Sequence, residues 1–177
     1  MRAVIPGIVV PPEESFNGLV GLAVTECDEH SARAELEVRR ELLQPWGIVH
    51  GGVYATIAES LASWATATVV VAAGQAAMGL SNATSFLRPV SAGTIHALAT
   101  RRHRGRTTWV WDVDMRDDEG RLCATSRVTI AVRAFEGAGA LAGDASAGDA
   151  GAGADAGEAG AGADAGEPSA GGADQPR

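Results

Sequence analysis

The feature that most constrains the fold is an apolar stretch, residues 53–73, that carries a single charged side chain, Glu59. No Lys or Arg occurs between Arg40 and Arg88, so this carboxylate has no basic neighbour in the sequence. Burying an unpaired carboxylate costs free energy, and proteins keep such a group mostly where its charge has a function. We therefore expect a helix in which Glu59 is a functional group. The alternative is a structural carboxylate whose hydrogen bonds are satisfied.

The same stretch is about long enough to span a bilayer as a helix. It lacks a basic flank, and besides Glu59 it contains five Ser and Thr side chains along its length: Thr56, Ser60, Ser63, Thr66 and Thr68. A helix that is apolar nearly all round is also typical of the fully buried centre of a globular domain. We expect this second arrangement, and no membrane partner.

The composition changes sharply near Glu136. Residues 137–177 are almost entirely Ala, Gly, Asp, Glu, Ser and Pro, and cannot bury enough apolar surface to offset the entropy of ordering. We expect one folded domain over residues 1–136, with its core at about 17–133, and a disordered acidic tail over 137–177. Seven acidic residues and one Arg give this tail a charge of −6, so only −2 of the total −8 remains for residues 1–136. A nearly neutral domain does not favour nucleic acid as a partner.

Alternating apolar and polar residues predict strands on both sides of the helix. In chain order we expect strands over 19–26 and 31–38, a helix that begins after the Gly51-Gly52 pair and ends near Gly74, and strands over 78–87, 93–103, 107–116 and 121–133. In the strand over 107–116, four residues share one face: Trp109, Trp111, Val113 and Met115. One long helix packed on an antiparallel sheet is the economical α+β architecture for the order β-β-α-β-β-β-β.

Gly51 and Gly52 open the helix, where free backbone N–H groups and the helix dipole favour negative charge. A backbone N–H there, with the Glu59 carboxylate about two turns further on, could polarise a carbonyl and supply a base or nucleophile. This is the minimum apparatus for acyl transfer. The pair of glycines alone also fits an ordinary junction between a loop and a helix.

Four polar residues on the helix, Thr56, Glu59, Ser63 and Thr66, are spaced by three and four positions and so share one face. This polar stripe is either part of a site or, for its hydroxyls, a set of side chains that bond back to carbonyls one turn earlier. The sequence leaves both interpretations open for the hydroxyls.

The string Gln44-Pro45-x-Gly47-x-x-His50-Gly51-Gly52, followed by Glu59 and Ser63, resembles the active-site segment of hotdog-fold acyl-CoA thioesterases. The most similar branch is the PaaI-like one, which includes 4-hydroxybenzoyl-CoA and dihydroxynaphthoyl-CoA thioesterases. Residues 82–83, 88–90 and 118–123 fit the same family, and the resemblance covers about residues 17–133. It implies a hotdog fold, in which an antiparallel sheet wraps around one long helix.

The resemblance also implies a catalytic role for each matching residue. Glu59 would attack the thioester carbonyl or activate a water, and the Gly51 N–H would polarise that carbonyl. Gln44 would help position the carbonyl or the water, and His50 would contact the thioester. Ser63 would help hold the carboxylate or the attacking water.

Basic residues are densest at residues 101–106. They either contact the phosphates of coenzyme A, together with Arg88, or form the solvated end of a hairpin. The candidates for binding substrate or coenzyme A are Gly52, Asn82, Arg88, Arg104 and Arg106.

Members of this family form dimers whose sheets join and whose sites lie at the interface, and many pair again into tetramers. The resemblance therefore implies an acyl-CoA substrate and a homodimer or homotetramer with interfacial active sites. Thioester hydrolysis by this route needs no cofactor and no metal, and the four histidines lack the spacing of metal ligands. The Gly-x-Ser-x-Gly motif of serine hydrolases is absent, which argues against a nucleophilic serine.

Cys27 and Cys123 form no metal or redox motif, and we expect reduced core thiols in a cytoplasmic protein. The expected function is hydrolysis of an aryl- or medium-chain acyl-CoA to coenzyme A and a carboxylic acid. The alternative is a hotdog protein that binds acyl-CoA without turnover, as a sensor or partner module.

Overall fold

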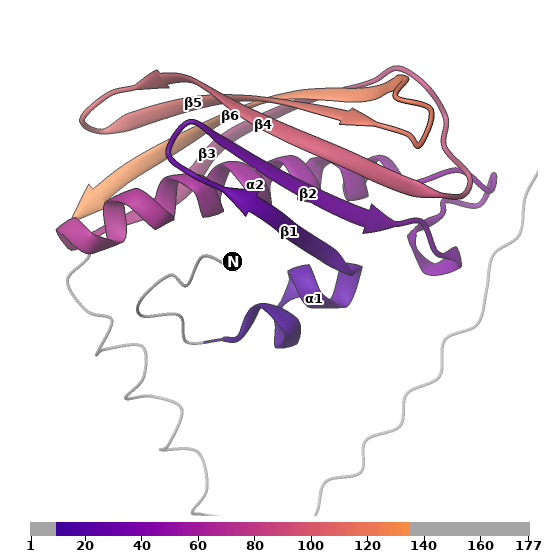
Figure 1. Cartoon of the computed structure of the whole chain (residues 1–177), viewed down its shortest axis with the longest axis horizontal. Helices are drawn as coiled ribbons and strands as arrows, with labels where there is room; N and C mark the ends of the chain where they lie inside the picture. Colours follow the sequence, from indigo (N-terminus) through magenta and orange to yellow (C-terminus); the bar gives the residue numbers. More distant parts are fainter. Residues whose placement is uncertain (1–9, 135–177) are drawn as a thin grey trace, which may run out of the picture.

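The computed structural model describes residues 10–134 (Figure 1). The expected acidic tail, residues 137–177, lies outside the described residues.

Two α-helices, three short 3-10 helices and six strands make up the described chain. Their order is η1 (Pro12–Glu14), α1 (Phe16–Val20), β1 (Leu22–Cys27), β2 (Ser31–Glu37), η2 (Arg40–Leu42), α2 (Gly51–Val70), η3 (Val71–Ala73), β3 (Gln75–Phe86), β4 (Thr94–Arg104), β5 (Thr108–Arg116) and β6 (Leu122–Ala134). The predicted helix and all six predicted strands are present.

The strands form one antiparallel sheet in the order β1-β2-β4-β5-β6-β3. Helix α2 lies along one face of this curved sheet and contacts all six strands (Figure 1). This arrangement is the hotdog fold, and it confirms the predicted α+β architecture. Strands β1 and β3 are the two edges of the sheet.

Helix α2 has well-defined ends. His50 is the N-cap, and its side chain accepts a hydrogen bond from the Gly52 N–H. At the other end α2 tightens into η3, and Gly74 stops the helix with a φ of 69°, in the left-handed region that favours glycine.

The expectation that α2 is buried all round is wrong for the described chain. Its buried side chains form one face that packs on the sheet: Val53, Tyr54, Ile57, Ala58, Leu61, Ala62, Ala65, Thr66 and Val70. Glu59 and Ser63 are half-buried, because the sheet covers only one side of the helix. The segment Gly51–Ala73 has the length and the mean hydropathy, 1.3, of a membrane span, as core helices of globular domains also do.

The core between helix and sheet contains the predicted face of β5: Trp109, Trp111, Val113 and Met115 are all buried. Trp111 Nε1 donates to Thr66 Oγ1 at 3.0 Å, and Thr66 Oγ1 donates to the Ala62 carbonyl at 2.8 Å. Thr66 therefore belongs to the core rather than to a polar site on the open side of α2.

Helix α1 was not predicted from the sequence pattern, and neither were the three short 3-10 helices. Helix α1 takes up Leu19 and Val20, which we assigned to the first strand, and Gly21 ends it with a φ of 79°. Ser60 Oγ donates to Asn17 Oδ1 at 2.7 Å, which links α1 to α2.

Candidate active site

The candidate site lies between the N-terminal half of α2 and the inward face of β3. The two elements run side by side in opposite directions, so Phe86 at the end of β3 lies against Gly51 at the start of α2. Further along, Asn82 Nδ2 donates to the Ala55 carbonyl at 2.9 Å. Still further, Gly79 lies against the carboxylate of Glu59.

Glu59 is held from its own helix by Ser63, whose Oγ donates to Glu59 Oε1 at 3.2 Å. Among residues 10–134, no Arg or His forms an ion pair with this carboxylate. The Glu59 carboxylate therefore has no basic partner in the folded domain over residues 10–134, as the sequence indicated. A half-buried carboxylate without a cation can accept a proton from a reactant.

The N-terminus of α2 presents one unused backbone donor. The Gly52 N–H donates to His50 Nδ1 at 2.9 Å, and the Val53 N–H donates to the His50 carbonyl at 2.9 Å. Within the described chain, the Gly51 N–H has no acceptor. It is therefore available to a carbonyl oxygen of a ligand, at the end of the helix where the dipole favours negative charge.

His50 is exposed, and its contact with Gly52 defines its tautomer. A neutral imidazole that accepts at Nδ1 carries its proton on Nε2. The Nε2–H is then free to donate to a ligand. His50 thus caps the helix with one ring nitrogen and presents a donor with the other.

Gln44 precedes the helix in a loop whose ends are tied together. Leu43 and Val49 form a β-bridge, and the Gln44 N–H donates to the Ile48 carbonyl at 2.8 Å. The His50 N–H donates to the Leu42 carbonyl at 2.9 Å, so the loop is fastened directly to the start of α2. This places the half-buried Gln44 on the segment that leads into the N-terminus of the helix.

Both the nitrogen and the oxygen of the Asn82 amide form hydrogen bonds within the chain. Besides the bond to Ala55, its Oδ1 accepts from Ser126 at 2.7 Å and from Thr84 at 2.8 Å. These contacts join β3 to β6 and to α2. A contact between Asn82 and substrate remains a prediction.

The candidate arginines do not gather at one place within the chain. Arg88 follows β3 at the N-terminal end of α2, whereas Arg104 and Arg106 line a pocket at the C-terminal end. The pocket has a volume of about 250 Å³, and its apolar walls include Val69, Val132 and Trp109. Because α2 has 20 residues, its two ends lie about 30 Å apart.

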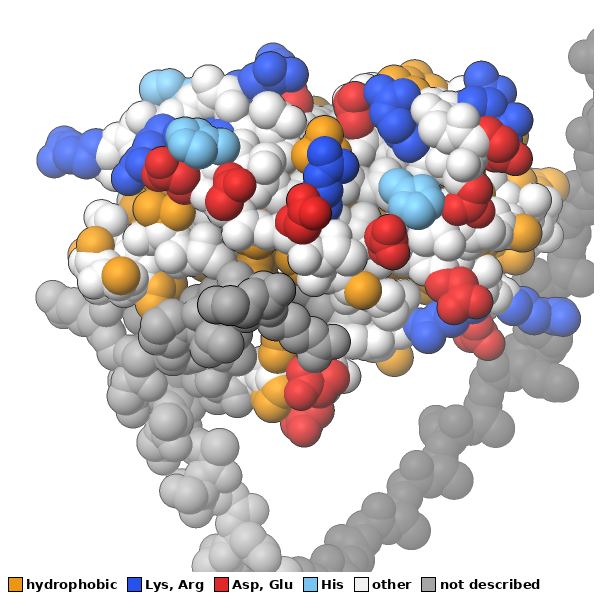
Figure 2. Space-filling view, viewed as in Figure 1, with side chains coloured by type: hydrophobic (Ala, Val, Ile, Leu, Met, Phe, Trp, Pro, Cys, Tyr) orange, Lys and Arg blue, Asp and Glu red, His pale blue; other side chains and the backbone are white. Residues whose placement is uncertain are grey.

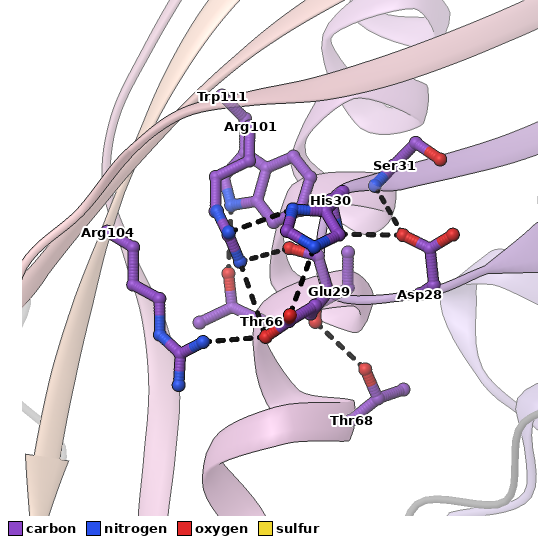
Figure 3. Close-up of polar contacts among 10 residues, drawn as sticks. Asp28, Glu29, His30, Ser31, Thr66, Thr68, Arg101, Arg104 and Trp111 are labelled. Atoms are coloured by element: carbon purple, nitrogen blue, oxygen red, sulfur yellow. Dashed lines mark hydrogen bonds and ion pairs between the residues drawn. The ribbon is translucent and has the colours of Figure 1, made fainter.

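Several of the basic residues at 101–106 are held by acidic partners (Figure 3). Arg104 Nη1 lies 2.6 Å and Arg101 Nη1 lies 3.8 Å from Glu29 Oε2, and Arg101 Nη2 also donates to His30 Nδ1 at 3.0 Å. Both guanidinium groups also lie about 5 Å from the centre of the Trp109 ring. Arg102 pairs instead with Asp112 at 2.8 Å on the other face of the hairpin. Three arginines of the hairpin, Arg101, Arg102 and Arg104, are therefore paired rather than freely solvated.

Acidic and basic side chains are interspersed over the face of the molecule seen in Figure 2. No single sign of charge dominates this face, as expected for a domain whose net charge is small. Among residues 10–134, no group of His, Cys, Asp and Glu side chains is arranged to hold a metal ion. Cys27 is half-buried and Cys123 is buried, and both are free thiols.

Sequence reasoning missed two aromatic residues at the N-terminus of α2. Phe86 is 59% exposed beside Gly51, and its ring centre lies 6.1 Å from that of Tyr54. Burial raises the pKa of the Tyr54 hydroxyl to about 12, and this hydroxyl has no hydrogen-bond partner within the described chain. Neither residue carries a local signal, because their neighbourhood depends on how β3 aligns with α2.

Comparison with known proteins assigns the family. The family model described as "Thioesterase superfamily" matches residues 47–124, the segment that contains α2 and most of the site. A Mycobacterium tuberculosis protein, provisionally named an esterase, is 39% identical over 117 residues, which cover 65% of this chain and 84% of the relative. The chain belongs to the thioesterase superfamily.

Other members of the superfamily agree with this assignment. The proofreading thioesterase EntH of Cronobacter sakazakii is 32% identical over 113 residues, 64% of this chain and 82% of that protein. The structure of the Mycobacterium tuberculosis protein is similar with a TM-score of 0.66 and 38% identity, over 69% of this chain and 98% of that one. A mutant thioesterase from Pseudomonas aeruginosa gives a TM-score of 0.67 and 32% identity, over 70% of this chain and 89% of that one.

Proposed function

We propose that this protein hydrolyses the thioester of an acyl-CoA, releasing coenzyme A and a carboxylic acid. The observation that carries the proposal is the placement of Glu59 about two turns beyond the unused Gly51 N–H on the same helix. A carbonyl oxygen bound at the helix N-terminus would be polarised there, and a carboxylate or a water that it holds would attack the carbonyl carbon. Membership of the thioesterase superfamily supports this reaction class.

In the reaction, the Gly51 N–H stabilises the negative charge that develops on the carbonyl oxygen. Glu59 takes a proton from water while the water oxygen bonds to the acyl carbon. The C–S bond then breaks, and the proton passes to the departing thiolate to give free coenzyme A. In the other route, Glu59 itself attacks the carbon, and the C–S bond breaks to release the thiolate of coenzyme A. Water then hydrolyses the resulting anhydride, which gives the carboxylic acid, restores the Glu59 carboxylate and supplies the proton that converts the thiolate into the free thiol.

The neighbouring residues support these steps in distinct ways. Ser63 orients the Glu59 carboxylate through its hydrogen bond, and the free Nε2–H of His50 would donate to the thioester. Gln44, on the loop fastened to the helix start, helps position the carbonyl or the water. Gly52 allows the substrate to approach the helix end closely, because it has no side chain.

The exposed edge of β3 supports a dimer. Met78 and Leu80 on this strand are 45% and 58% exposed, and a long apolar edge with unpaired backbone groups is a ready template for pairing with another chain. Two β3 edges paired about a two-fold axis would run antiparallel. The pocket at Arg104 and Arg106 of one chain would then lie toward the Gly51 end of the other.

Such a dimer would assemble each site from two chains. Coenzyme A would be bound through its phosphates by arginines, and the aryl- or medium-chain acyl group would lie near Phe86. A polar edge substitution, Leu80→Lys, should weaken dimers or tetramers measured by light scattering. An unchanged oligomeric state would show that β3 is not the interface.

The reaction is tested by mixing the purified, full-length protein with a panel of aryl and aliphatic acyl-CoA thioesters and measuring thiol release with a thiol-reactive dye. We expect release that is proportional to enzyme concentration and strongest for aryl or medium-chain groups. Tight binding of an acyl-CoA without thiol release would identify a non-catalytic binding protein instead. We expect the protein to act in the cytoplasm on an acyl-CoA substrate.

A further inference from the structure

Strand β3 carries a bulge beside the Glu59 carboxylate. Gly79 pairs with Ile130 of β6, and the next pair along is Ser81 with Thr129, so Leu80 is an extra residue without a partner. Residues three apart in a regular strand point to opposite faces. Because of the extra residue, Gly79 and Asn82 both face α2, where Asn82 bonds the Ala55 carbonyl.

At Gly79 the carboxylate of Glu59 occupies the space that a side chain would take. A Cβ atom at this position would overlap Oε1 of Glu59, and would lie 2.8 Å from its Cδ and 3.1 Å from its Oε2. The Glu59 carboxylate therefore lies where the side chain of residue 79 would begin. The glycine is required here for room, because its φ is not among the positive values found in the described chain.

We propose that Gly79 is a positioning residue for the reaction, which seats the Glu59 carboxylate against β3. The inference rests on the proposed function and deepens it. Ser63 holds Oε1 from the helix side, and Gly79 provides the surface on the strand side. Together they fix the carboxylate at one distance from the Gly51 N–H, whereas any larger residue at position 79 would push it away.

The first test is the variant Gly79→Ala, compared with Ser85→Ala on the outward, exposed side of the same strand. A displacement of a reacting group by about 1 Å can lower turnover by about 100-fold. We expect kcat of Gly79→Ala to fall by about 10-fold to 100-fold with KM changed little, and Ser85→Ala to keep the parent value. Parent kcat in a folded Gly79→Ala protein would overturn the proposal.

The second test compares melting temperatures, so its result does not depend on the activity of the variants. In the parent background the new methyl group displaces the Glu59 carboxylate from its position beside Ser63 Oγ, so we expect Gly79→Ala to lower the melting temperature relative to the same change made in a Glu59→Ala background. In a Glu59→Ala background the methyl group has room, and alanine costs less conformational entropy than glycine in a strand, so the same change should leave the melting temperature equal or higher.

The two tests separate this inference from the proposed function. An active Glu59→Ala protein would contradict the role of Glu59 in catalysis but would leave the melting-temperature comparison intact. An equal loss of melting temperature in both backgrounds, or failure of the double variant to fold, would show that Gly79 supports the strand in general and would overturn the inference.

Discussion

The Gly52 N–H donates to Nδ1 of His50 at 2.9 Å, so one ring nitrogen of this histidine caps helix α2. The cap leaves the other nitrogen, Nε2, as a donor on the exposed side of the ring. Stability and substrate contact are therefore assigned to different atoms of the same side chain. Two substitutions can separate them.

His50→Ala removes both the cap and the donor, and we expect it to lower the free energy of unfolding by about 1 kcal/mol. His50→Asn keeps a good N-cap acceptor and removes the Nε2–H, so it should retain most of the stability. Both variants should lose thioesterase activity. Urea unfolding and thiol release measure the two effects, and an active His50→Asn protein would show that the donor is not used.

The elements of the fold could be predicted because each has a strong local pattern. The apolar stretch that ends before Gly74 predicted helix α2. The alternation of apolar and polar residues through Trp109 and Trp111 predicted β5 and its buried face. Helix α1 was missed because its few residues continue into β1 without a break in hydrophobicity, and only the backbone of Gly21 separates them.

The sequence could predict only those parts of the site whose residues lie on one secondary-structure element. Gly51 and Glu59 lie on one helix, so their spacing is fixed by helical geometry. The contacts of Phe86 with Gly51 and of Gly79 with Glu59 depend on the alignment of β3 with α2, and a bulge shifts that alignment. Helical spacing alone could not show that the Thr66 hydroxyl accepts a hydrogen bond from Trp111 in the core, instead of lying on the side of α2 that the sheet leaves uncovered.

The bond from Trp111 to Thr66 gives a prediction about stability. Both residues are fully buried, so Thr66→Val would leave the Trp111 Nε1–H without an acceptor. A buried donor left unpaired costs about 1–3 kcal/mol. Thr66→Ser keeps the hydroxyl and is the matched control. Equal free energies of unfolding for the two variants in urea would contradict the assigned role of the bond.

His96 predicts a dependence of stability on pH. Its Nε2 lies 2.9 Å from Asp118 Oδ1, and its Nδ1 lies 3.4 Å from Glu35 Oε1. The hydrogen bond to Asp118 raises the pKa of His96, and the same bond lowers the pKa of Asp118. The contribution of His96 is therefore complete below its unfolded pKa of about 6.5 and is lost as the pH rises through the higher folded value.

The corresponding measurement is urea unfolding of the parent and of His96→Gln at about pH 5.5 and about pH 8.5. The parent should exceed the variant by more at the lower pH. At still lower pH the pair should weaken again, as Asp118 becomes protonated on passing below its depressed pKa. A difference between the two proteins that is the same at both pH values would show that the ion pairs of His96 do not stabilise the fold.

The pocket at the C-terminal end of α2 predicts where coenzyme A is recognised. Arg106 lines this pocket, and its guanidinium forms no ion pair within residues 10–134, unlike that of Arg104. Arg106→Ala should raise KM for an acyl-CoA several-fold while leaving KM for the matching acyl-pantetheine unchanged, because the latter lacks the nucleotide phosphates. Arg102→Ala, which breaks only the pair with Asp112, is the control. An equal change for both substrates would place the nucleotide elsewhere.

The central claim is that the Glu59 carboxylate performs the chemistry, and Glu59→Gln tests it most directly. Glutamine has nearly the same shape and can still accept the bond from Ser63, but it can neither take up a proton nor attack a carbonyl. The variant should keep the melting temperature and the oligomeric state of the parent. Its kcat for thiol release from the parent's best acyl-CoA substrate should be lower by about 100-fold to 10,000-fold. A folded Glu59→Gln protein with the kcat of the parent would contradict the account.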